Sequence, residues 1–470
     1  MLPPMSSRLA GADAFWLRAE SPSNRMVICG FLALEGALSL DTLKARLAPH
    51  LGTIPGFRRA VDLRAGEPRW ADADDFDPDR HFSEIHVPPG SGDEALMAVL
   101  EALIPEPLPA ERPLWGFVLV QGLASGSVVV ARFHHCLADG IALVALLLSL
   151  TTPLDDAVAG TASTDLSPPE DPLMWARDQV DRAQAIVRRG RRFLGHLGPA
   201  ALRARGLELR DASRKLASLS PQDHPAFKAR LGTAKRVTWS PPLPLEPMKA
   251  MARAVDGKLN DVLLALVCGA LRRFTEARGT PLQPGESLRA TVPVNLRPLE
   301  VAHELGNRFG LLFVDLPVTT VGVEARLAEL KRQMDVLKQS SEPLLTFGIM
   351  RAVGWGPPEL QDQLVDLFSR RTSLVLSNVP GPRRRLAFAG RPLRRVMFWV
   401  PQSGSVSLGL SLISYAGELM LGINADRGLF PDAAALARAL YEEHDHMAEV
   451  LGIPHPAVVG PDASAVPASP

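Results

Sequence analysis

The sequence is poor in aromatic residues, in lysine and in cysteine, and each scarcity narrows the choice of function. Aromatic residues make up 6% of the 470, with only two Tyr, which disfavours stacking platforms for carbohydrate or single-stranded nucleic acid. The 51 acidic residues balance 43 Arg and 8 Lys, so no net charge indicates a nucleic-acid partner. The three cysteines, Cys29, Cys136 and Cys268, form neither a CxxC pair nor a disulfide framework, which favours a reducing compartment.

Long hydrophobic runs are also missing. The longest, residues 141–148 and 262–266, fall far short of the roughly 20 residues that a helix needs to cross a bilayer. The N-terminal stretch MLPPMSSRLAGADAFWL lacks the cationic start and apolar core of a secretory signal. We therefore expect a cytoplasmic protein, and a peripheral contact with the inner membrane or with lipid inclusions stays an open alternative.

The remaining composition is that of a folded protein, with 46% hydrophobic and 22% charged residues. Residues 1–150 and 235–455 both mix strand and helix patterns. Between them, residues 151–234 begin as a Pro, Ser, Thr and Asp-rich stretch and continue as a basic helical segment, while residues 456–470 are typical of a disordered tail. The pattern predicts an α/β (α+β) protein with two units of similar size around a linker.

Runs rich in β-branched residues and bounded by Gly or charge predict strands. These runs are residues 26–34, 114–121, 127–133, 236–239, 288–294, 310–316, 373–376, 396–400 and 406–414. Apolar residues at helical spacing predict helices at residues 40–51, 141–150, 260–276 and 323–338.

The chemistry is concentrated in the segment HHCLADG, which contains His134, His135, Asp139 and Gly140 between a predicted strand and an apolar helix. A histidine at the end of a buried strand can act as a general base, because its unperturbed pKa is about 6.5. Adjacent side chains diverge, so one histidine can face a substrate while the other braces the loop. We expect Asp139 to fix the loop through an ion pair, and Gly140 to permit a sharp turn into the helix.

A purely structural role for these histidines and a metal site are the alternatives. Two adjacent histidines cannot normally reach one ion, and neither a His-x₃-His spacing nor a third ligand lies nearby, so we expect no metal. Cys136 sits inside the motif, and we interpret it as a small buried hydrophobe. The nucleophile motif GxSxG is absent from the chain.

The segment HHCLADG resembles the HHxxxDG active-site motif of the CoA-dependent acyltransferase superfamily, and the chain most resembles the bacterial wax ester synthase/diacylglycerol acyltransferase family. Further segments are similar to family signatures in the right order, from about residue 5 to 450. They are DAFWL at residues 13–17, the PLW element (Pro113, Leu114, Trp115), the ND element (Asn260, Asp261), VPVNLRP with Arg297, GNRFG at residues 306–310, and SNVPGP with Ser377, Asn378, Pro380 and Gly381.

The resemblance implies two chloramphenicol-acetyltransferase-like lobes joined by a helical linker, with an active-site tunnel between them. Acyl-CoA would enter from one side, and diacylglycerol or a fatty alcohol from the other, to give triacylglycerol or a wax ester. His135 would remove the proton from the acceptor hydroxyl, with no cofactor and no covalent acyl-enzyme. The alternatives are a related acyltransferase that esterifies another hydroxylated acceptor, and a catalytically inactive lipid-binding protein.

The supporting motifs admit structural and functional interpretations. Trp115 is expected in the core or the tunnel wall, and Asn260 at a helix N-cap with Asp261 in the first turn. Asn378 either contacts substrate or only orders the rigid SNVPGP turn. We expect Asp139 to pair with Arg297, because a buried carboxylate without a partner is costly.

Two basic segments remain. Residues 383–385 are three arginines, which either bind the phosphates of CoA or form a solvated face. Residues 177–215 contain eleven basic and four acidic residues interspersed with apolar ones. This segment either lies on an anionic membrane or lipid surface, or packs between the lobes as a strut.

Overall fold

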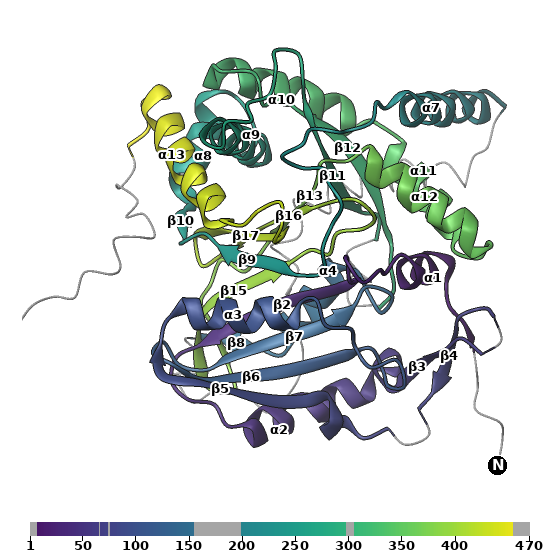
Figure 1. The fold of residues 1–470 in the computed structure, drawn as a ribbon, viewed down its shortest axis with the longest axis vertical. Coiled ribbons are helices and arrows are strands. Elements are labelled where there is room, and N and C mark those ends of the chain that lie inside the picture. Colours follow the sequence, from purple (N-terminus) through teal and green to yellow (C-terminus); the bar gives the residue numbers. More distant parts are fainter. Residues whose placement is uncertain (1–6, 65, 74–75, 155–198, 298–304, 455–470) are drawn as a thin grey trace, which may run out of the picture.

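A computed structural model describes residues 7–64, 66–73, 76–154, 199–297, 305–454 of the chain. The predicted tail at 456–470 and most of the basic segment, up to residue 198, lie outside this part. The described residues form two sheet-rich lobes stacked on each other, as predicted, with helices on their outer faces (Figure 1).

The first lobe is built on a seven-stranded sheet with the strand order β5-β6-β7-β2-β15-β14-β8. Its strands are β2 Val27–Leu34, β5 Phe82–Ser91, β6 Trp115–Leu123, β7 Val128–His134, β8 Thr152–Pro153, β14 Leu386–Phe388 and β15 Arg391–Trp399. A small sheet beside it, in the order β1-β4-β3, contains Ser7–Arg8, Arg69–Asp72 and Arg59–Asp62. The helical elements of this half are α1 Gly11–Arg18, α2 Leu40–Thr53, α3 Asp93–Leu103, α4 Gly140–Ser149 and the 3₁₀ turns Pro55–Arg58 and Pro78–His81.

The second lobe has a seven-stranded sheet in the order β10-β17-β16-β13-β11-β12, with β9 also paired to β17. Its strands are β9 Lys235–Trp239, β10 Leu243–Pro244, β11 Leu288–Asn295, β12 Phe309–Leu316, β13 Leu374–Pro380, β16 Leu408–Tyr415 and β17 Glu418–Asp426. Its helices are α7 Pro199–Ser218, α8 Leu245–Ala254, α9 Leu259–Ala277, α10 Val323–Leu337, α11 Glu342–Val353, α12 Pro358–Arg370 and α13 Ala434–Val450.

Each predicted strand and helix has a counterpart within a few residues. Strand β5 was not predicted, because it is an edge strand whose residues are mostly exposed and include two prolines, so it lacks a hydrophobic signature. Strand β17 and helices α1, α3, α8, α11, α12 and α13 were also not predicted.

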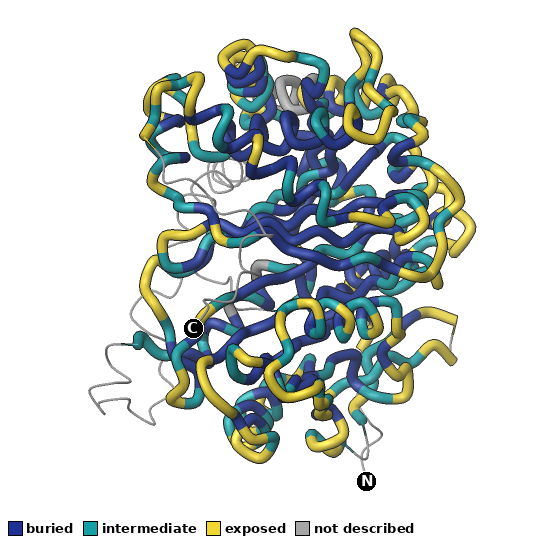
Figure 2. Tube along the Cα trace, turned by 60° about the vertical axis from the view of Figure 1, so that its left-hand side comes forward, coloured by how far each residue is buried: buried dark blue, intermediate teal, exposed yellow. Residues whose placement is uncertain are grey.

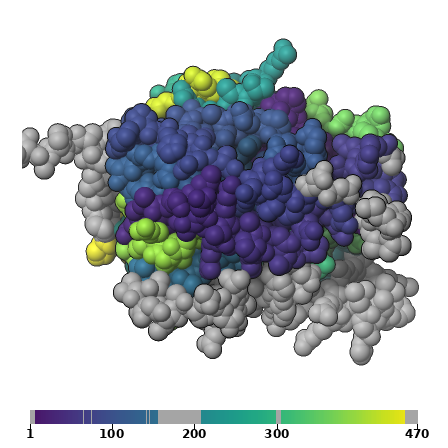
Figure 3. All heavy atoms as spheres, turned by 90° about the horizontal axis from the view of Figure 1, so that it is seen from below, coloured from purple at the N-terminus to yellow at the C-terminus, as the bar shows by residue number. Residues whose placement is uncertain are grey.

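The sequence-based division at residue 235 does not separate the two sheets. Strands β14 and β15 come from the second half of the chain, yet β15 pairs antiparallel with β2, Met397 opposite Phe31, and so completes the first sheet. In Figure 3 the light-green surface of this crossing hairpin lies beside the purple N-terminal residues. A pairing over such a sequence distance depends on tertiary packing, which no local pattern can report.

Two large hydrophobic cores fill the lobes, one around the first sheet and one between the second sheet and helices α9, α10 and α13. Buried strands run through the middle of the molecule, and exposed residues gather on the outer helices and loops (Figure 2). A third, smaller cluster lies where the lobes meet and includes Phe15, Trp16, Phe309 and Met350. The chemistry-bearing residues lie next to this third cluster.

Candidate active site

The HHCLADG segment lies at the junction of the lobes, between the end of β7 and the start of α4. It is tied to the segment that precedes β12. The Gly306 amide donates to the Leu137 carbonyl over 2.9 Å, and Ala138 forms a bridge with Gly306. Gly306 has φ 99°, in a region that side chains rarely adopt, so glycine suits this turn. The turn places the next residue, Asn307, against His135.

His135 is held in one tautomer by Asn307. The His135 Nδ1 atom lies 2.9 Å from Asn307 Oδ1. The Asn307 Nδ2 group donates to the His135 carbonyl over 2.7 Å and to Asp13 Oδ1 over 2.8 Å. Because the carbonyl only accepts hydrogen bonds, Asn307 must turn its NH₂ group that way and its oxygen toward the ring. The network therefore assigns the proton to Nδ1 of His135 and a lone pair to Nε2.

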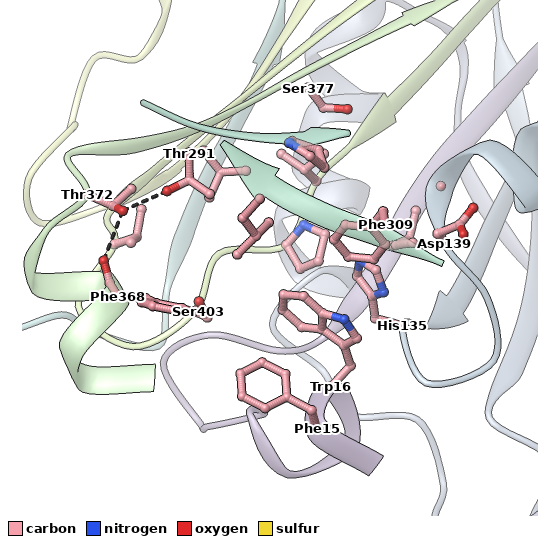
Figure 4. A pocket seen from close by; sticks show the side chains of 18 of the residues that line it. Phe15, Trp16, His135, Asp139, Thr291, Phe309, Phe368, Thr372, Ser377 and Ser403 are labelled. Carbon is pink, nitrogen blue, oxygen red and sulfur yellow. Dashed lines mark hydrogen bonds between the residues drawn. The ribbon is translucent and has the colours of Figure 1, made fainter. Parts of the chain in front are cut away.

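The surroundings of His135 are apolar. Its ring is stacked on Trp16, with 4.7 Å between centroids, and Phe309 lies 5.4 Å away (Figure 4). Burial lowers the pKa of His135 to about 4, so the ring is neutral at pH 7. His135 can therefore accept a proton without first losing one.

A cavity of about 120 Å³ begins at His135 and runs between the lobes. Its wall is mainly apolar, with a few hydroxyl and amide groups, and the Thr291–Thr372 hydrogen bond of 2.7 Å lies on one side (Figure 4). The lining residues are Phe15, Trp16, Ile28, His135, Asp139, Gly140, Thr291, Pro293, Asn295, Phe309, Leu311, Val365, Phe368, Ser369, Thr372, Val375, Ser377, Asn378, Val379, Phe398, Val400, Pro401, Ser403 and Val406. Such a space suits an alkyl chain better than a polar ligand.

His134 points to the other side of the loop. Its Nδ1 atom accepts a hydrogen bond from the Cys136 amide over 3.1 Å, so its proton is on Nε2, which lies 3.3 Å from Glu20 Oε2. His134 is not among the residues that line the cavity. The expected division of roles is present, since His134 braces the loop and His135 faces the cavity.

Asp139 and Arg297 form the predicted ion pair, 3.2 Å apart, with both side chains buried. The other Asp139 oxygen accepts from the Ala142 amide over 3.0 Å, which caps the N-terminus of α4. The Asp139 carboxylate also accepts from the Arg308 amide over 3.3 Å. Asp139 thus joins the motif loop to the segment around Arg297 and Arg308.

The expectation that Gly140 permits a sharp turn into the helix was wrong. Gly140 is the first residue of α4, it is not among the residues with positive φ, and a Cβ there would meet no atom within 4 Å. The turn into the helix therefore does not need a glycine. Because Gly140 lines the cavity, its missing side chain leaves space beside His135.

The PLW element supports the loop from behind and does not line the cavity. Trp115 is buried in the first core, donates to the Phe57 carbonyl over 2.9 Å and is stacked on His81. The Leu114 carbonyl accepts from the His134 amide over 2.9 Å. Pro113 precedes this contact, so the element holds the end of β7 in place.

The ND element lies within the first turn of helix α9, and its Asn260 is two residues after the N-cap. Helix α9 begins at Leu259, so the N-cap is Lys258, and the expectation that Asn260 occupies it was wrong. Asp261 Oδ2 accepts from the Lys258 amide over 2.9 Å and closes the first turn. Asn260 Oδ1 instead accepts from Asn378 Nδ2 over 3.3 Å, which links α9 to β13.

The SNVPGP segment divides into a cavity part and a structural part. Ser377 and Asn378 line the cavity, whereas Pro380 and Gly381 do not. A Cβ on Gly381 would lie 2.0 Å from the Ser414 carbonyl oxygen, so glycine is required where β13 meets β16. The arginines at 383–385 are exposed and lie outside the cavity lining.

Three residues of the site had no role assigned from the sequence: Asp13, Trp16 and Asn307. They lie in segments that resemble family signatures, DAFWL and GNRFG, but no spacing shows that positions 13, 135 and 307 meet. Within the described ranges, the active site included, no group of three or more His, Cys, Asp or Glu side chains could hold a metal ion. None of the described helices has the length and apolar character that spanning a membrane requires.

Comparison with known proteins gives a consistent family match. The model of the wax ester synthase/diacylglycerol acyltransferase catalytic domain matches residues 9–263, and that of the WS/DGAT C-terminal domain matches residues 305–448. A relative from Mycobacterium tuberculosis, named as a diacylglycerol O-acyltransferase, is 27% identical, over 95% of this chain and 96% of its own.

Solved structures show the same two-lobed fold. The wax ester synthase/diacylglycerol acyltransferase of Marinobacter aquaeolei superposes with a TM-score of 0.66 at 18% identity, covering 95% of this chain and all of its own. The first condensation domain of the calcium-dependent antibiotic synthetase gives 0.62 at 14%, over 96% of this chain and 97% of its own. The predicted fold class, two lobes of the chloramphenicol-acetyltransferase type, is therefore confirmed.

Proposed function

The chain belongs to the wax ester synthase/diacylglycerol acyltransferase family and is an acyltransferase, and from this premise we propose that it moves a fatty acyl group from acyl-CoA to diacylglycerol, a long-chain alcohol, or both. The observation that carries this proposal is the neutral His135, with its free Nε2 lone pair, at an apolar cavity between the lobes. The apolar lining of the cavity suits the alkyl groups next to the reacting atoms.

In the proposed reaction His135 Nε2 takes the proton of the acceptor hydroxyl while the oxygen attacks the thioester carbonyl carbon. The tetrahedral intermediate then collapses, the carbon–sulfur bond breaks, and the CoA thiolate takes the proton back from His135. The products are the ester and free CoA. No proton is gained or lost overall, and the reaction needs no cofactor beyond the acyl-CoA substrate.

Cys136 is not a good candidate for a covalent acyl-enzyme. The thiol is fully buried, and burial raises its pKa well above the usual range, so the reactive thiolate does not form near neutral pH. The direct transfer through His135 is therefore the simpler route.

We further propose a peripheral contact with a membrane or lipid inclusion. Both acceptors dissolve poorly in water, and the segment 177–215 combines positive charge with apolar residues. Only its C-terminal part is described: there Lys215 pairs with Glu342 over 2.5 Å and faces the protein, whereas Arg210 and Arg214 are exposed.

Helix α12 offers a second apolar surface, next to the cavity. Its inner side chains Val365 and Phe368 line the cavity, while Leu360 and Leu367 on the adjoining face are 47% and 43% exposed. A lipid surface in contact with these leucines would lie beside the cavity that receives the acceptor. Co-sedimentation with anionic and neutral vesicles, at low and high salt, tests the contact, and equal binding to both vesicle types would contradict a role for the basic segment.

A substrate panel tests the proposed reaction. The purified chain is given palmitoyl-CoA with hexadecanol or diacylglycerol, the released thiol is measured, and the ester is identified by chromatography. We expect acceptor-dependent thiol release and the matching ester. When the same panel is run with His135→Ala, the His86→Ala variant is its matched control, since His86 is an exposed histidine on the far edge of the first sheet. Tight acyl-CoA binding without ester formation would instead support the inactive lipid-binding alternative.

A further inference from the structure

We propose that Asn307, held by the Asp13 carboxylate, is the positioning residue that sets the tautomer of His135, and that protonation of Asp13 switches the base off. This inference rests on the proposed function in one respect, which is that His135 is the general base. It assigns roles to two residues that lie outside the cavity lining.

The amide of Asn307 is the centre of the arrangement. Each of its three polar positions has its own partner: the ring of His135, the carbonyl of His135 and the carboxylate of Asp13. An asparagine amide can rotate by half a turn with little change in shape, so only its partners decide which end faces the ring. The rotated amide would present NH₂ to Nδ1 of His135, move the ring proton to Nε2 and remove the lone pair from the cavity.

Asp13 opposes this rotation together with the His135 carbonyl, and it is the one of these two acceptors that can titrate. Its Oδ1 atom accepts from the side chain of Asn307 over 2.8 Å and from the Asn307 backbone amide over 2.9 Å. Hydrogen bonds to an ionised carboxylate are roughly twice as strong as those between neutral groups. Protonation of Asp13 therefore weakens both bonds and lowers the preference for the productive amide orientation.

Asp13 is placed to titrate in the relevant range. Burial raises the pKa of Asp13 to about 6, although the hydrogen bonds from Asn307 lower it. The other charged groups that face Asp13 are Asp139, which raises the pKa, and Arg297, which lowers it, and these two form an ion pair with each other. As pH falls, Asp13 takes up a proton before His135, whose pKa is lowered to about 4.

An amide between the carboxylate and the ring also has a chemical consequence. A carboxylate in direct contact with His135 would favour the charged imidazolium and raise the pKa of the ring. The neutral Asn307 adds no charge beside the ring: its hydrogen bond raises the pKa of His135, but burial lowers this pKa by more. The carboxylate charge thus acts through the amide of Asn307, and His135 stays neutral, with its one ring proton on Nδ1 and none on Nε2.

The first test is a direct measurement of the tautomer. The full chain is labelled with ¹⁵N in its histidine rings, and the His135 signals are identified by their loss in His135→Gln. We expect His135 to carry its proton on Nδ1 at pH 7.5 in the wild-type protein, and to lose this preference in Asn307→Ala and, in wild type, below pH 6. A proton on Nε2 in the wild-type protein would overturn the inference and would leave the acyltransferase function untouched.

The second test is the pH profile of kcat/KM for the wild type, Asp13→Asn, Asn307→Asp and the double exchange. We expect an acid limb near pH 6 in the wild type, and a loss of about 10- to 100-fold at pH 7.5 in Asp13→Asn, whose residual activity no longer has that limb. Asn307→Asp places two carboxylates together and should lose activity more severely, whereas the double exchange should recover part of it. A limb that stays near pH 6 in Asp13→Asn would overturn the switch.

Variants that only damage the fold are recognised separately. Circular dichroism and thermal melting report on folding, and a purely structural role for Asp13 would lower activity equally at every pH. If the wild type shows no acyl transfer at all, the proposed function fails, while the tautomer measurement still decides the positioning of His135.

Discussion

Two regions of the molecule contain a buried arginine–carboxylate pair, and only one of them belongs to the active site. At the lobe junction Arg297 pairs with Asp139. In the helical layer of the second lobe Arg326 of α10 pairs with Glu443 of α13, which also accepts from Arg273 of α9 over 2.8 Å. The carboxylates are 5% and 0% exposed, so burial does not distinguish the two pairs.

What distinguishes them is the set of segments that each pair connects. Asp139 also caps α4 and accepts from the Arg308 amide, next to Asn307, so its pair determines how the motif loop meets the other lobe. Glu443 joins three helices of one layer, away from the cavity lining. A buried ion pair by itself therefore indicates only a contribution to folding. A functional role requires in addition that the pair positions a group that faces the cavity.

The largest expected effect is in the junction. His135→Ala should lower kcat by about 10²–10⁴-fold, the usual contribution of a general base, while the protein stays folded. His134→Ala should lose activity through loop geometry, and its melting temperature should fall because the contact with Glu20 is lost. Near-wild-type turnover by a folded His135→Ala protein would exclude His135 as the base.

Asp139→Ala should combine both kinds of loss. Removing one side of a buried ion pair costs about 3–5 kcal/mol in the free energy of unfolding, because Arg297 is left buried without its carboxylate. The α4 cap is lost as well, and the loop that carries His135 shifts, so activity per folded molecule should also fall. Urea denaturation and initial rates measure the two effects, and unchanged rates would contradict the junction role.

Glu443→Ala provides the matched contrast. We expect a similar loss of about 3–5 kcal/mol in the free energy of unfolding, since Arg326 and Arg273 lose their shared partner. Activity per folded molecule should stay within a factor of about two, because no cavity residue moves. If Glu443→Ala fails to fold, Glu443→Gln serves for the same comparison, and a large fall in its KM or kcat would break the distinction between the regions.

The smallest expected effect concerns stability in acid. The pKa of His135 is lowered to about 4 by burial, so below pH 6.5 the unfolded chain binds a proton that the folded chain does not. This group therefore destabilises the fold as pH falls from about 6.5 to 4, by up to roughly 3 kcal/mol. Asp13 acts in the opposite direction, since its pKa is raised to about 6. His135→Gln should consequently lose less stability than wild type between pH 7 and 5, measured by urea denaturation, and an equal loss would contradict the burial of a neutral ring.

Much of the local structure was predictable because its signals are local. The β-branched composition of residues 127–133, the polar loop HHCLADG and the apolar run after it predicted the strand, the loop and the helix in their observed order. The pairing of Asp139 with Arg297 followed from the cost of a buried carboxylate and the presence of a basic residue in a similar family segment. The N-cap of α9 was misplaced by two residues, because Lys258 occupies it without the side chain that usually marks the position.

The sequence by itself thus determined the strand and the helix on either side of the reactive histidine loop, the identity of that loop and the family. Only the tertiary structure decided in which tautomer His135 faces the cavity, that β14 and β15 complete the first sheet, and that Asp13 and Asn307 meet beside His135. The physical reason is the distance along the sequence between the residues that interact. Helix and strand patterns arise from neighbours a few residues apart, whereas the proton on Nδ1 depends on hydrogen bonds among positions 13, 135 and 307, which come together only when the two lobes pack.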